Sequence, residues 1–121
     1  EDFASKECGY WNCKYRLEAV VYLQQLVEAT MQRETFGRVN APLFLGYYYK
    51  DEQNQDQVVR VDAARKMFTQ LGTPATLKVE QAFPEAGTHV IGCELFSGAV
   101  SEVRQSVFRF AEEKLGLQPV Q

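Results

Sequence analysis

The chain has 121 residues, of which 45% are hydrophobic and 24% charged, an ordinary composition for a globular domain with one modest core. Its net charge of −3 comes without any basic run, which argues against nucleic acid as a partner. No apolar stretch approaches the length of a membrane span, and the start at Glu1 lacks the features of a signal peptide. The compartment stays open, with the cytoplasm as the default expectation and a leader on a longer chain as the alternative.

Three cysteines, an odd number, exclude a complete set of disulfides within one chain. Cys8 and Cys13 could form a bridge in an oxidising compartment, but two free thiols are the expectation. Their spacing is not that of a zinc site, so we expect no metal and no cofactor. Cys93 lies in an apolar stretch and is expected to be a small buried residue.

The first half of the chain predicts one helix and one strand. Residues 1–13 have no periodicity and predict an irregular segment. From about residue 14 to 33, apolar residues at helical spacing predict an amphipathic helix. The run 43–49 is short and almost wholly apolar or aromatic, which is typical of a strand covered on both faces in a parallel sheet. The polar residues 50–57 that follow predict a loop.

The second half predicts two helices around a second strand. A helix is expected from residue 58 or 59 to 71, with Gly72 at its end. Alternating polar and apolar residues predict a strand at 76–83, nearer an edge of the sheet. After a loop, a last helix is expected from about residue 98 to 115, ended by Gly116.

The order helix–strand–helix–strand–helix predicts a single α/β domain over residues 1–121, with two adjacent parallel strands. Two parallel strands make a very small sheet, and the strand at 43–49 is too apolar to face water along its edge. We expect this strand to be covered by strands of a longer protein. In the isolated chain, we expect self-association through the same strand.

Chemically useful side chains follow both predicted strands. Asp56 precedes a helix, and His89, the single histidine, follows the second strand. Because carboxyl ends of adjacent parallel strands meet at one edge of a sheet, these two side chains can approach each other. A carboxylate beside a histidine fixes the ring tautomer and stabilises the imidazolium, as in a nucleophile–histidine–acid triad. An N-cap role for Asp56 and a structural role for His89 are the simpler readings of each residue alone.

The stretch 41–116 resembles the C-terminal part of an α/β-hydrolase. The resemblance rests on Pro42 leading an apolar strand, on the acid and hydrophobic pair at 56–59, and on Gly87-Thr88-His89 before the last helix. The order of acid and then histidine is also the order of that family. The resemblance implies a three-layer α/β fragment that forms the C-terminal portion of a catalytic domain.

Two features depart from the pattern of this family. No Gly-x-Ser-x-Gly occurs, and the nearest candidate, Ser97, has no glycine two residues before it. The loop with the acid is also long. Counting from Pro42 favours Asp51 as the acid, whereas counting back from the hydrophobic pair favours Asp56. We prefer Asp56, because the pair fixes the start of the helix, and Asp51 stays the alternative.

The resemblance implies an esterase- or lipase-like serine hydrolase acting on small-molecule esters. His89 would act as general base and then general acid, Asp56 would orient it, and the serine would precede Glu1 in a longer chain. The 121 residues alone are then expected to be inactive. One alternative is a small non-catalytic α/β binding or interaction module in which His89 is structural. Less favoured is a redox or metal protein that uses Cys8, Cys13 and His89.

Overall fold

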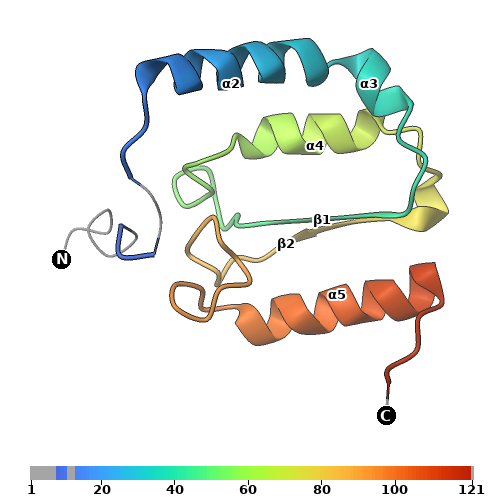
Figure 1. The fold of residues 1–121 in the computed structure, drawn as a ribbon. Helices are drawn as coiled ribbons and strands as arrows, with labels where there is room; N and C mark the ends of the chain where they lie inside the picture. The colour runs from blue at the N-terminus through green and yellow to red at the C-terminus, as the bar shows by residue number, and fades with distance from the viewer. Residues whose placement is uncertain (1–7, 11–12, 121) are drawn as a thin grey trace. The chain divides into compact units, whose positions relative to one another are not determined.

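A computed structural model of the chain describes residues 8–10 and 13–120 (Figure 1). The chain divides into two compact units, residues 1–32 and residues 33–121. Most of the segment 1–13, which was predicted to be irregular, lies outside the described residues. Within it, residues 8–10 form a turn. The expectation of a single domain stays a prediction.

The first unit contains a disulfide and the helix α2. Cys8 and Cys13 are bonded, with their Cα atoms 5.5 Å apart, so the expectation of two free thiols is wrong. A turn at residues 8–10 brings the two Cα atoms into the range that a disulfide spans. Helix α2 spans Leu17–Thr30 and ends with the Met31 amide donating to the carbonyl oxygen of Val27. It is shorter than predicted, because residues 33–37 form a separate helix.

The second unit holds the predicted strands and the remaining helices. Its two strands, β1 (Leu43–Tyr47) and β2 (Lys78–Ala82), pair in parallel, with Leu43 opposite Lys78. This confirms an α/β chain with two adjacent parallel strands. The other elements are α3 (Arg33–Gly37), α4 (Val61–Gln70), the 3-10 turn η1 (Ala75–Leu77) and α5 (Val100–Leu115).

Helices α4 and α5 lie on opposite sides of the two-stranded sheet (Figure 1). Phe83, which is fully buried, packs with Ala86, Ala99 and Val103. Phe44 of β1 reaches α5, with its ring centroid 5.7 Å from that of Phe110. This cluster joins α5 and the loop after β2 to the sheet, so the same burial that stabilises the core also fixes the loop.

Two glycines follow helices, for different physical reasons. Gly116 has a φ of 66° and ends α5 in the left-handed conformation, as predicted. Gly72 follows α4 without a positive φ, and its amide donates to the carbonyl oxygen of Phe36. A Cβ added at Gly72 would lie 2.3 Å from the carbonyl oxygen of Gly37. Close approach of α3, and not helix capping, is what requires glycine at position 72.

Candidate functional site

The loop after β1 folds back on itself. Tyr49 forms an antiparallel bridge with Gln55, and the Asp56 amide donates to the carbonyl oxygen of Tyr48 at 3.1 Å. At the tip, Oδ1 of Asp51 accepts hydrogen bonds from the amides of Gln53 and Asn54. The loop therefore returns Asp56 to the carboxyl end of β1 in spite of its length.

The loop after β2 begins beside the same strand end. The Phe83 amide donates to the carbonyl oxygen of Tyr47 at 2.8 Å, which extends the parallel pairing by one step. Gly87 then turns the chain with a φ of 68°, a conformation that favours glycine. Ala86 and Thr88 are buried on either side of it. These contacts bring His89 to the edge of the sheet where the acid loop ends.

Asp56 and His89 are in direct contact, 33 residues apart in sequence. Oδ2 of Asp56 lies 2.6 Å from Nδ1 of His89. The other carboxylate oxygen, Oδ1, accepts hydrogen bonds from the amides of Val58 and Val59 at 2.8 and 3.0 Å. The Asp56 side chain is 3% exposed and that of His89 is 42% exposed. The acid is thus buried and held at both oxygens, while part of the ring faces solvent.

The electrostatics of this contact set the tautomer of His89. Burial opposes ionisation of Asp56, but hydrogen bonds from His89, Val59 and Val58 outweigh it and hold the pKa of Asp56 below its usual value. An ionised carboxylate can only accept hydrogen bonds, so the shared proton belongs to Nδ1 of His89. In the neutral ring, Nε2 then carries the lone pair. This is the tautomer that can take a proton from a hydroxyl group.

The other candidate carboxylates lie elsewhere. Asp51 is exposed, its hydrogen bonds remain within the loop, and those from Asn54 lower its pKa. Glu85 forms an exposed ion pair of 3.6 Å with Lys50. Within residues 8–10 and 13–120, Asp56 is the one carboxylate paired with His89. The structure thus brings together the preferred acid and the histidine, and it does not bring Asp51 to them.

The described part of the chain offers no nucleophile in contact with the base. There, the side chain of His89 hydrogen-bonds to Asp56 and to nothing else. Oγ of Ser97 accepts a hydrogen bond from the Ala99 amide at 3.1 Å, at the start of α5, and Ser106 is buried within that helix. The site therefore consists of a base and its orienting acid.

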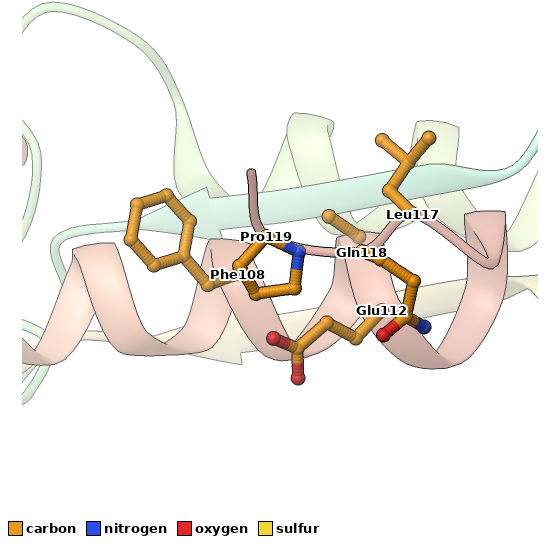
Figure 2. A pocket seen from close by; sticks show the side chains of 6 residues that line it. Phe108, Glu112, Leu117, Gln118 and Pro119 are labelled. Carbon is orange, nitrogen blue, oxygen red and sulfur yellow. The ribbon is translucent and has the colours of Figure 1, made fainter. Parts of the chain in front are cut away.

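The described residues offer little to other kinds of site. They include no group of three or more His, Cys, Asp or Glu side chains that could hold a metal ion. None of the helices in this part of the chain is long and apolar enough to cross a bilayer. A mostly apolar pocket lies between α5 and the residues after it, and its lining includes neither Asp56 nor His89 (Figure 2). It is lined by Phe108, Ala111, Glu112, Leu117, Gln118 and Pro119.

Sequence reasoning missed two residues that shape the site. Asn54 donates to both carboxylate oxygens of Asp51 and so closes the tip of the acid loop. The clustering of Asp and Asn, which favour turns, was the available signal. Gly98 lies close to the backbone of Glu85, and no local sequence pattern predicts a contact between residues so far apart in the chain.

No protein-family model, no curated protein and no solved structure matches the chain. The resemblance of residues 41–116 to α/β-hydrolases therefore rests on residue types and their order. The geometry of Asp56 and His89 is the remaining basis for a function.

Proposed function

We propose that this chain carries the acid and the histidine of a serine hydrolase. It would form the C-terminal portion of a three-layer α/β-hydrolase catalytic domain that acts on small-molecule esters. The observation that carries the proposal is the 2.6 Å contact between Asp56 and His89. Two further features support it: the acid is buried, and both residues follow the carboxyl ends of adjacent parallel strands.

The chemistry follows from the tautomer of His89. A serine hydroxyl next to Nε2 would give its proton to the ring while its oxygen bonds to the acyl carbon of the ester. The imidazolium formed would be stabilised by the carboxylate of Asp56. The ring would then return the proton to the leaving alcohol as the carbon–oxygen bond breaks, which leaves an acyl-enzyme. Water would release the acid in a second round with the same base.

The nucleophile and the oxyanion hole would come from chain that precedes Glu1 in a longer protein. Without a serine there is no covalent route, and the remaining contacts give little rate enhancement. The 121 residues alone are accordingly inactive in this proposal. No cofactor takes part in it.

The test compares the 121-residue chain with the protein encoded together with its upstream sequence. A fluorophosphonate probe should label one serine in the longer protein and none in the 121-residue chain. Both His89→Ala and Asp56→Asn should reduce hydrolysis of a nitrophenyl ester by the longer protein, by about 10³-fold or more. Asp51→Asn, which keeps Oδ1 as the acceptor for the amides of Gln53 and Asn54, is the matched control and should leave the rate unchanged. Serine-type turnover by the 121 residues alone would overturn the proposal.

The proposal includes a partner for β1. This strand pairs with β2 along one edge and carries no charged side chain, whereas β2 carries Lys78 and Glu80. Charged residues protect exposed sheet edges from pairing, and β1 lacks them. Self-association of the isolated chain through residues 43–49 is the expected result. Light scattering over a concentration series should show it, and Leu45→Lys should weaken it, whereas a clean monomer at high concentration would contradict it.

A non-catalytic α/β interaction module is the second candidate. It is favoured by the compactness of residues 33–121 and by the lack of a nucleophile beside His89 in the described residues. In that case, no serine of the longer protein would react with the probe. His89→Ala would then alter stability or partner binding alone.

A further inference from the structure

The loop that carries His89 is closed where its two ends meet, a place called the loop base below. The Gly98 amide donates to the carbonyl oxygen of Ala86 at 3.2 Å, so the ends of the loop 86–98 touch, as in an Ω-loop. His89 lies within this loop, near its Ala86 end. Its carbonyl oxygen accepts a hydrogen bond from the Ile91 amide at 3.0 Å, which tightens the turn after it. The closure between Ala86 and Gly98 at the loop base therefore affects the position of the His89 imidazole.

Gly98 permits an unusually close approach at this base. A Cβ added to Gly98 would lie 2.5 Å from the carbonyl oxygen of Glu85 and 3.6 Å from its carbonyl carbon. A side chain at position 98 would collide with backbone, which cannot rotate out of the way as the end of a flexible side chain can. Either the Glu85–Ala86 backbone or the start of α5 would have to move.

Buried residues flank both sides of this contact. On the loop side, Ala86 is 2% and Thr88 6% exposed, so both are held by packing. On the helix side, Ala99 is 4% exposed and belongs to the core cluster with Phe83. Because close-packed groups transmit displacement, a shift of the loop base would reach His89 through its buried neighbours.

We infer that Gly98 is a positioning residue for His89: the missing side chain at position 98 lets the loop base close so that Nδ1 meets Asp56. The relevance of this closure to catalysis rests on the proposed function. Its geometric part does not, because the contact between Asp56 and His89 can be observed in the 121-residue chain without any turnover.

The test compares Gly98→Ala with Gly92→Ala, a glycine of the same loop. A Cβ at Gly92 would meet Val103 Cγ1 at 3.9 Å, an ordinary contact, and its φ is not positive. Gly98→Ala should raise the pKa of Asp56, followed by carboxyl ¹³C NMR, and should remove the downfield Nδ1 proton signal of the single histidine. Gly92→Ala should preserve both signals. A Gly98→Ala variant that keeps both would overturn the inference.

A second control addresses the stability of α5. Ser97→Ala removes the hydroxyl that accepts from the Ala99 amide without adding a collision. It should lower the melting temperature and preserve the NMR signals of the pair. In an active longer protein, Gly98→Ala should lower kcat by about tenfold or more with little change in KM, since misplaced catalytic groups lose rate. If Gly98→Ala disturbs the NMR signals of the pair but the longer protein has no hydrolase activity, the proposed function is refuted. The positioning role of Gly98 then still stands.

Hydrogen exchange provides the measurement if Gly98→Ala does not fold. In the unaltered chain, the Gly98 amide and the Nδ1 proton of His89 should become exchangeable through a common opening with the same free energy. Free exchange at Gly98 while the Nδ1 proton stays protected would overturn the inference.

Discussion

The hydroxyl of Tyr47 donates a hydrogen bond of 2.8 Å to Oε1 of Glu80, which joins β1 to β2 through their side chains. The same carboxylate oxygen accepts from Nε of Arg65 on α4 at 2.7 Å. Three elements thus share one half-buried carboxylate on the face of the sheet that α4 covers.

The first prediction concerns the ionisation of Tyr47. Burial, the hydrogen bond to Glu80 and the charge of Glu80 raise the pKa of Tyr47 to about 12. Glu80→Gln should lower this pKa toward the ordinary value, because the negative charge disappears. Titration by ¹³Cζ NMR of labelled tyrosine measures it. Glu52→Gln, which alters an exposed carboxylate bonded to Tyr49, is the control and should leave the pKa of Tyr47 unchanged.

The second prediction concerns acid stability. The folded pKa of Asp56 lies below that of the unfolded chain, about 3.9, so ionised Asp56 stabilises the fold above that pH. This stability is lost as the pH falls through the lowered folded value. Asp56→Asn should lower the free energy of unfolding at pH 7 by about 1–3 kcal/mol and flatten its decline below pH 4. Urea unfolding from pH 2 to 7 measures both, and a decline as steep as that of the unaltered chain would contradict the prediction.

A control for this second prediction is Asp62→Asn. Asp62 pairs with Arg60 at the surface, where both side chains are largely exposed. Such pairs contribute little to stability, so at pH 7 this variant should lose far less free energy of unfolding than Asp56→Asn.

The third prediction concerns the core. Phe83 is fully buried between the sheet and α5, and Phe83→Ala should lower the free energy of unfolding by about 3–5 kcal/mol. Phe108 of α5 is 60% exposed, and Phe108→Ala should change the free energy of unfolding by about 0.5 kcal/mol or less. Urea denaturation of both variants compares them. Equal losses would mean that Phe83 is not the centre of the core.

The fourth prediction is a thiol count. Because Cys8 and Cys13 are bonded and Cys93 is free, alkylation of the unreduced, denatured protein should add one label. Alkylation after reduction should add three. Mass spectrometry distinguishes the two results, and three labels without reduction would show that the bridge is absent.

The sequence was sufficient to predict the α/β organisation, because helical spacing and apolar runs are local properties. It was also sufficient to predict that Asp56 and His89 could meet, since the carboxyl ends of adjacent parallel strands share one edge. Choosing between Asp51 and Asp56 was harder. Counting along the chain assumes an extended loop, whereas Tyr49 and Gln55 pair and bring Asp56 back to the strand.

The features that the sequence did not predict depend on contacts between distant segments or on turns, and local patterns encode neither. Gly72 was expected to cap α4, but the approach of Gly37 decides that position. The bridge between Cys8 and Cys13 depends on the turn between them. The break at Met31 and Gln32, which separates α2 from α3, interrupts a segment whose apolar spacing predicts one longer helix.

The parallel pairing of β1 and β2 also bears on how the chain folds. Leu43 pairs with Lys78, and all of α4 lies between them in sequence, so the ends of a long segment must come together before the two strands can pair. Closing such a segment is slow, because its entropy is lost before the contacts form. The hydrogen bond between Asp56 and His89 depends on this pairing, so we expect its Nδ1 proton to gain protection among the last events of refolding. The single histidine would then report, from one resonance, when the sheet has formed.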